Sequence, residues 1–264
     1  MRLKISHSTQ YSYDAPVPYA LQRIRLCPPP AQTQEIISWQ LDVLGADEEV
    51  RFFDQFGNDT RLYSVPSGST LISITARGEI EVRDTAGVTG PHSGYAPLWL
   101  FKQATPLTQP GALTAEIAAP FTSGNDIERL HGLSNAIRDR VAYRVGTTDA
   151  ATTAEEALER GEGVCQDHSH IFIASARELG FPARYVSGYL MLNETTEQAA
   201  THAWAEAHIA GLGWVGFDVS NGISPDGRYV RLATGRDYRD AMPISGIRLG
   251  QAQELLEVHI TVEQ

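Results

Sequence analysis

The sequence has little cysteine, no excess of positive charge and no long apolar run. Two cysteines, Cys27 and Cys165, are too few for a disulfide-stapled secreted fold. The formal net charge is −11, so the positive field that attracts nucleic acid or an anionic membrane surface is missing. No stretch reaches the ~18 apolar residues of a membrane helix, and the first residues lack the apolar core of a signal peptide. We therefore expect a cytoplasmic protein whose partners are neither nucleic acid nor membrane.

The length of the chain and the change of composition along it indicate the domain organisation. The chain has 264 residues, of which 42% are hydrophobic, enough for one large domain or two ordinary ones. Residues 1–88 contain short segments in which apolar and polar residues alternate, typical of antiparallel strands. A glycine- and proline-rich stretch covers 89–120. The sequence therefore predicts a β-rich domain over 1–88 and a second domain over 89–264, with 89–120 as the connection.

Helical signals appear only in the second part of the chain. From Ile127 to Val141, apolar residues recur at spacings of three and four, and Asn125 can cap the helix. Thr153 and Glu156 form a capping-box pattern. The short strands of residues 1–88, in contrast, suggest an antiparallel sandwich or open barrel.

Cys165 stands where a helix is expected to begin. Gly161 and Gly163 precede it, and the residues after it have helical composition until Gly180. The positive end of a helix favours a thiolate, and unpaired backbone N–H groups there can hold an oxyanion. A free cysteine can equally be a small buried apolar residue, so the catalytic interpretation needs a base.

A predicted hairpin supplies the base and a carboxylate. Residues 201–209 alternate strictly, and Gly211 lies at the turn to a returning strand that ends at Asp218. One face of the first strand carries His202, Trp204, Glu206 and His208. A hairpin centred on Gly211 places Asp218 opposite Trp204 and one diagonal step from His202, about 7–8 Å between backbone positions. Cys165, His202 and Asp218 then form the set needed for nucleophilic acyl transfer.

The sequence also resembles the transglutaminase-like superfamily. Four ordered blocks carry the resemblance: 163–167 (GVCQD), 181–189 (FPARYVSGY), 202–206 (HAWAE) and 213–218 (GWVGFD). Residues 1–88 look like the β-rich N-terminal region of its bacterial members, and 235–240 (GRDYRD) is similar to another of their blocks. Many relatives have Pro-Thr after the aspartate, where this chain has Val219 and Ser220.

The resemblance implies a papain-like α+β core, in which the cysteine helix packs on an antiparallel sheet, and a Cys165–His202–Asp218 triad. It says little about the substrate, because the superfamily includes cross-linking transferases, proteases, amidases and inactive members. We expect a cysteine peptidase or amidase that forms a thioester acyl-enzyme on a peptide or protein amide and needs no cofactor or metal, since no acidic run resembles a calcium-binding loop. The alternative acceptor is a lysine amine, which would make the protein a cross-linking transglutaminase. We expect water, because the chain has no additional domain to present an amine donor.

Two other classes of function stay open. A metal site could use Cys165, His168 and His170, with His202 and His208, although residues two apart on a helix point in different directions. The fold could also be a binding module with an idle triad. Four further residues are candidates either to line the cleft or to support it: Asp167, Trp204, Glu206 and Asn221.

Overall fold

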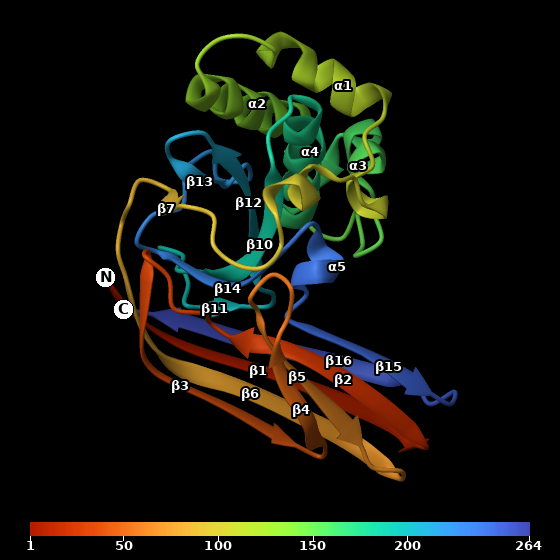
Figure 1. Ribbon diagram of the computed structural model, residues 1–264. Helices are drawn as coiled ribbons and strands as arrows, with labels where there is room; N and C mark the ends of the chain where they lie inside the picture. The colour runs from red at the N-terminus through yellow and green to blue at the C-terminus, as the bar shows by residue number, and fades with distance from the viewer.

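Helices and sheets are segregated in the computed structural model, which describes residues 1–264 and confirms the predicted α+β fold. Figure 1 shows the helices gathered on one side of a central sheet and two further sheets on its other side. The two further sheets have the strand orders β11-β16-β1-β6-β3 and β15-β2-β5-β4, and the central sheet has the order β14-β10-β12-β13-β7. The central sheet therefore has one face toward the helices and the other toward the N-terminal strands.

The N-terminal region is antiparallel β-structure. Its strands are β1 (Arg2–Val17), β2 (Tyr19–Cys27), β3 (Gln34–Leu44), β4 (Asp47–Phe53), β5 (Asp59–Val65) and β6 (Ser69–Val82). In β1 every second side chain from Leu3 to Tyr13 is buried, the pattern of a strand with one face on a core. This core also takes in Tyr189, Val230 and Leu232 of the central sheet, so the two regions share buried apolar surface.

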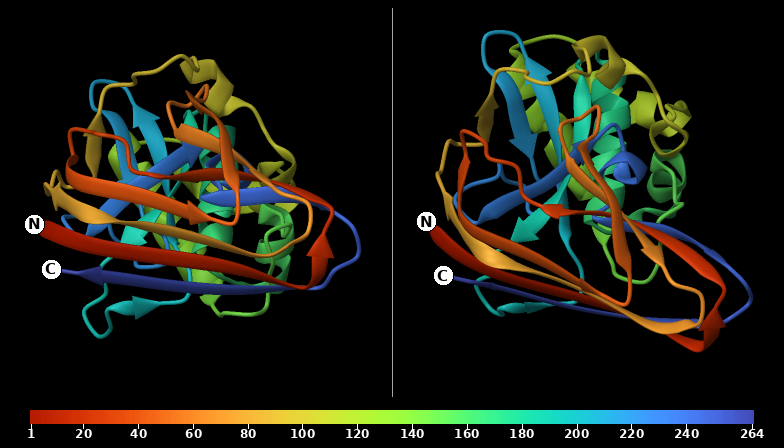
Figure 2. Two further views of the ribbon diagram at one scale, coloured as in Figure 1. Left: turned by 90° about the horizontal axis from the view of Figure 1, so that it is seen from below. Right: turned by 60° about the horizontal axis from the view of Figure 1, so that its bottom comes forward.

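The last two strands complete the sheets that the first strands begin. They are β15 (Ile244–Leu249) and β16 (Glu254–Glu263). Ile244 lies opposite Ile24 of β2, and Val262 lies opposite Ile5 of β1. Figure 2 shows the two chain ends side by side. By strand pairing these residues therefore lie with the N-terminal sheets, although the predicted boundary placed all of 89–264 in the second domain.

The helices follow the connection. In chain order this part contains β7 (Val88–Gly90), the 3-10 helices Leu98–Lys102 and Pro106–Thr108, α1 (Ala112–Ala118), a third 3-10 helix (Ala119–Phe121), α2 (Asp126–Arg140), β8 (Ala142–Tyr143), α3 (Ala154–Arg160), β9 (Glu162–Gly163) and α4 (Cys165–Glu178). Asn125 caps α2 and Thr153 with Glu156 closes a capping box on α3, as predicted. Buried Arg177 of α4 donates to the carbonyl of Phe101 and the hydroxyl of Thr108, which fastens the connection to the helix.

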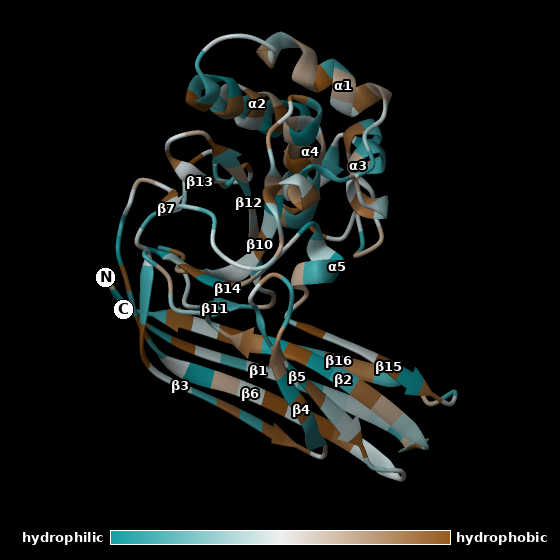
Figure 3. Ribbon diagram, in the orientation of Figure 1, coloured by the Kyte–Doolittle hydropathy of each residue, from teal (hydrophilic) through white to brown (hydrophobic).

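The central sheet supports α4. Its main strands are β10 (Ala183–Leu190), β12 (His202–Ile209), β13 (Gly213–Phe217) and β14 (Tyr229–Gly235); short β11 (Glu197–Gln198) and α5 (Tyr238–Ala241) flank them. Ala203, Ala205 and Ala207 belong to the same buried cluster as the apolar residues of α4. Their small size lets the helix approach the sheet closely. In Figure 3 the hydrophobic bands of α4 lie between the other helices and this sheet. No helix combines the length and hydrophobicity that crossing a bilayer requires.

Candidate active site

The β12–β13 hairpin has the predicted register. Ala205 lies opposite Phe217, and Ile209 lies opposite Gly213, so the turn is centred on Gly211. Gly211 has a φ of 84°, a left-handed conformation that glycine adopts without strain. This register brings Asp218, the residue after β13, beside the beginning of β12, where His202 stands. The hairpin prediction is confirmed, and with it the approach of the carboxylate to the imidazole.

His202 and Asp218 form a short, buried pair. Nε2 of His202 lies 2.6 Å from Oδ2 of Asp218, whose side chain is fully buried. The same oxygen accepts from Nδ2 of Asn221 and from the hydroxyl of Tyr229, each over 2.7 Å. Burial alone would raise the pKa of Asp218, but these hydrogen bonds and the charge of His202 lower it. The carboxylate therefore stays ionised although water does not reach it.

Cys165 is the first residue of α4, as predicted, and its side chain is partly exposed. Its thiol lies near His202. Because Asp218 occupies Nε2 of the ring, Nδ1 is the atom left for the sulfur. Burial would lower the pKa of His202, but the hydrogen bond to Asp218, the proximity of the Cys165 thiol and the negative charge of both groups raise it to about 10. The structure thus brings the three predicted residues together around an imidazole that stays protonated at neutral pH.

Asp167 holds the beginning of α4. Its Oδ2 accepts from the backbone N–H of Val164 and from the hydroxyl of Thr148, each over 2.7 Å. Burial is the main cause that raises the pKa of Asp167. A Cβ atom at position 163 would lie 2.7 Å from the Cβ atom of Asp167, too close for van der Waals contact. This clash explains why position 163 is a glycine. Of the two roles predicted for Asp167, the structure favours support of the helix over lining of the cleft.

The other histidines on α4 are engaged elsewhere. Nδ1 of His168 pairs with the hydroxyl of Ser220, and its Nε2 pairs with the carbonyl oxygen of Val141. Nε2 of His170 accepts from the backbone N–H of Tyr238. No group of three or more histidine, cysteine, aspartate or glutamate side chains is placed to hold a metal ion. His168 and His170 therefore do not join Cys165 in a group of metal ligands.

Residues 219–222 form a loop directly after Asp218. Asp218 and Ile223 form an isolated bridge, and the chain between them turns back so that Asn221 reaches the carboxylate. Ser220 contacts His168 instead. The loop therefore gives Asp218 an additional donor. Asn221 supports the carboxylate, one of its two predicted roles.

Aromatic side chains enclose the His202–Asp218 pair. The Trp204 ring stacks on that of His202 with 6.4 Å between centroids, and Tyr229 meets Trp204 edge-on at 5.5 Å. Sequence reasoning missed Tyr229, because it stands on β14, two strands away from β12, and no local pattern marks it. It also missed Tyr143, whose pKa is raised to about 12 by burial and by the negative charges of Cys165 and Asp218.

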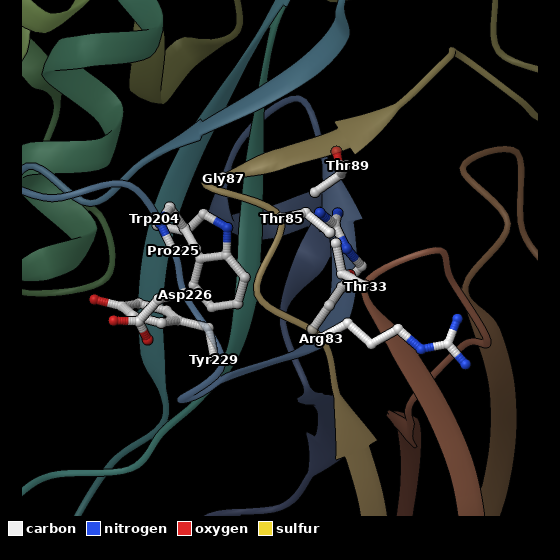
Figure 4. A pocket seen from close by; sticks show the side chains of 10 residues that line it. Thr33, Arg83, Thr85, Gly87, Thr89, Trp204, Pro225, Asp226 and Tyr229 are labelled. Atoms are coloured by element: carbon white, nitrogen blue, oxygen red, sulfur yellow. The ribbon is translucent and has the colours of Figure 1, made fainter. Parts of the chain in front are cut away.

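Two hollows border this group of residues. One, of ≈ 20 Å³, lies behind Trp204 and Tyr229, which share one wall while Thr33, Arg83 and Thr85 lie across from them (Figure 4). It has room for about one water molecule and is too small for a substrate. The other, of ≈ 420 Å³, is lined by residues 190–195 and by Asn221, Ile223, Arg228 and Tyr229. The second hollow has room for a group of substrate size, and its walls include Asn221 and Tyr229, which hydrogen bond to Asp218.

Comparisons with known proteins agree with this geometry. A family model described as the transglutaminase-like superfamily matches residues 113–219, and one described as the bacterial transglutaminase-like N-terminal region matches residues 3–81. An uncharacterized protein of Mycobacterium leprae is 26% identical, with 99% of this chain and 98% of that protein covered. An uncharacterized protein of Mycobacterium tuberculosis is 29% identical over 93% of this chain and 87% of its own length.

A solved structure shares the fold. It is a candidate cysteine protease from Cytophaga hutchinsonii, with a TM-score of 0.79, 22% identity, and coverage of 100% of this chain and 90% of that one. Identity at this level establishes the common fold and leaves the reaction open. The two matched segments cover both the N-terminal strands and the part of the chain that holds Cys165, His202 and Asp218.

Proposed function

Because the chain belongs to the transglutaminase-like superfamily, we propose that it is a cysteine-nucleophile acyl-transfer enzyme that hydrolyses a peptide or related amide bond. The observation that carries the proposal is the position of His202, which contacts the thiol of Cys165 and the buried carboxylate of Asp218. An imidazole held between a thiol and a carboxylate can pair with a thiolate and later donate its proton.

The first half-reaction forms an acyl-enzyme. The thiolate of Cys165 attacks the amide carbonyl carbon, and the carbonyl oxygen becomes an oxyanion. Backbone N–H groups in the first turn of a helix have no intrahelical partner, so those of α4 can bind that oxygen. The C–N bond breaks as protonated His202 gives its proton to the leaving amine, which leaves a thioester on Cys165 and a neutral imidazole.

The second half-reaction releases the acyl group. Neutral His202 takes a proton from water, and the resulting hydroxide attacks the thioester carbon. The C–S bond then breaks, which yields a carboxylic acid and restores the thiolate beside protonated His202. Asp218 stabilises the imidazolium in both halves and does not itself take up a proton. A lysine amine in place of water would give cross-linking by the same steps.

A screen of peptide and protein amides tests the proposal. We expect turnover by the wild-type chain, no turnover by Cys165→Ala, and normal turnover by Cys27→Ala, the matched control. Mass spectrometry of the products separates a gain of water from attachment of an added amine. A chain that turns over no amide, with Cys165 no more reactive than Cys27, would instead favour the binding module. A cytoplasmic location, where both cysteines would stay reduced, is part of the same proposal.

A further inference from the structure

Two arginine side chains share one glutamate on the face of the central sheet that points away from α4. Glu206 of β12 is fully buried; its Oε2 accepts from Nε of Arg184 over 2.7 Å, and its Oε1 accepts from Nη2 of Arg231. The side chains of Arg184 and Arg231 are only 13% and 8% exposed. They come from β10 and β14, so the three charged groups belong to adjacent strands.

The charges in this cluster do not balance. Both arginines lower the pKa of Glu206, so the glutamate is ionised, and it supplies one negative charge against two positive ones. Asp226 lies on the far side of Arg231 but is bound by the guanidinium of Arg228. An unmatched guanidinium with little access to water is unfavourable unless an anion offsets it. The cluster therefore has the electrostatic character of an anion receptor.

The guanidinium groups border a large pocket. It has a volume of ≈ 520 Å³ and lies between loops of the N-terminal sheets and the central sheet. Its lining includes Arg184, Arg231, Trp214, Phe56 and Ser93 and contains no aspartate or glutamate. The guanidinium of Arg184 lies 4.0 Å above the ring of Trp214, which fixes its plane. Each guanidinium uses one of its nitrogens on Glu206, so further N–H donors remain for a ligand.

Three polar side chains of the pocket are already paired. Nε1 of Trp214 donates to Nδ1 of His92, and Nε2 of His92 pairs with the carbonyl oxygen of Ala96. Nδ2 of Asn58 donates to the carbonyl of Thr234. The arginine N–H groups are thus the charged donors with capacity to spare.

We propose that this pocket binds a small organic anion through a carboxylate or phosphate group. Arginine forks match the oxygens of both groups, and Trp214 and Phe56 offer apolar walls to the rest of the ligand. The volume falls in the range of ordinary ligand sites. Glu206 lies four residues beyond His202 on β12, about 13 Å away, so this site is separate from the proposed acyl-transfer chemistry.

Calorimetric titration of the full-length Cys165→Ala chain at low ionic strength tests the proposal without relying on activity. The probes are inorganic phosphate, benzoate and uncharged benzamide. We expect saturable binding of phosphate, benzoate or both at one site per chain, and none of benzamide. Phosphate alone would identify a phosphate ligand, and benzoate alone would identify a carboxylate. Failure of both anions to saturate a site would overturn the proposal.

Two serine variants test whether the anion binds in this pocket. Arg184→Gln removes one donor but disturbs a buried ion cluster, so Ser93→Asp on the exposed rim is the safer variant. Its carboxylate would compete for the arginines and weaken anion binding by about tenfold or more, the size of a lost charge-assisted hydrogen bond. Ser123→Asp adds the same charge in an exposed loop outside the pocket and should leave binding unchanged. Equal affinities in these two variants would overturn the proposal.

Discussion

The hydroxyl of Tyr229 donates to Oδ2 of Asp218 over 2.7 Å, and the same oxygen pairs with His202. Tyr229 is buried and comes from β14, whereas His202 is on β12. A buried carboxylate with several donors is held both ionised and in one orientation. Asp218, the carboxylate that orients the proposed base His202, is therefore itself held in place by a residue of a more distant strand, β14.

Tyr229→Phe should weaken the base without removing a reacting group. Loss of one donor makes the ionised form of Asp218 less stable, so its pKa should rise and the pKa of His202 should fall. We expect a loss of about 1.5–3 kcal/mol in the free energy of unfolding, typical of one lost hydrogen bond to a charged group. NMR titration of His202 measures the shift. Tyr95→Phe, which removes an exposed hydroxyl, is the control. If the pKa of His202 were the same in both variants, the role of Tyr229 in supporting Asp218 would be contradicted.

Alkylation of Cys165 should persist at low pH. His202 has a pKa of about 10, so the imidazole beside Cys165 is protonated at neutral pH, and a neighbouring positive charge favours a thiolate over a thiol. An ordinary thiol ionises near pH 8.5, and burial raises the pKa of Cys27 further. Iodoacetamide labelling, measured by peptide mass spectrometry, should therefore modify Cys165 well below pH 8 and Cys27 only at higher pH.

His202→Ala tests whether the imidazole is the cause of the fast iodoacetamide labelling of Cys165. His202→Ala removes the cation, so labelling of Cys165 near neutral pH should slow by about tenfold or more. Labelling of Cys27 in the same samples should not change. A Cys165 labelling profile that rises only around pH 8–9 in the wild-type chain would remove the basis for an activated thiolate.

The hairpin that carries His202 could be predicted because its information is local. Strict alternation along β12 and a glycine turn at 211 leave one register that keeps the alanines on the helix side. The beginning of α4 at Cys165 was equally predictable, from glycines before it and helical composition after it. Both predictions depend on neighbours within about twenty residues.

The features that the sequence did not reveal depend on distant segments. Tyr229 reaches Asp218 from a strand that pairs with β10, not with β12. The pairing of β16 with β1 joins residues from opposite ends of the chain, and strand-forming composition does not specify a partner. The Arg184–Glu206–Arg231 cluster likewise requires the order of three strands, which only the folded sheet defines.

Asp167→Ala should loosen the helix that carries the nucleophile. The carboxylate accepts from the backbone of Val164 and from Thr148, so its loss removes the cap of α4. We expect a decrease of about 0.5–2 kcal/mol in the free energy of unfolding, measured by urea denaturation, and slower alkylation of Cys165. Glu156→Ala, which removes a similar cap from α3, should lower stability but leave alkylation unchanged. Equal alkylation rates in both variants would contradict the assignment.

Residues 1–88 should not fold when they are produced alone. In the full chain β1 pairs with β16 along most of its length, and β2 pairs with β15. Without residues 244–263 both strands would become open edges, and their core would also lose Tyr189 and Val230 of the central sheet. We expect disorder or aggregation by circular dichroism and size-exclusion chromatography. A fusion of 1–88 to 244–264 through a flexible linker restores the two pairings and should gain β-structure. A folded, monomeric 1–88 fragment would show that the N-terminal strands are sufficient by themselves and that the C-terminal strands only cover their edges.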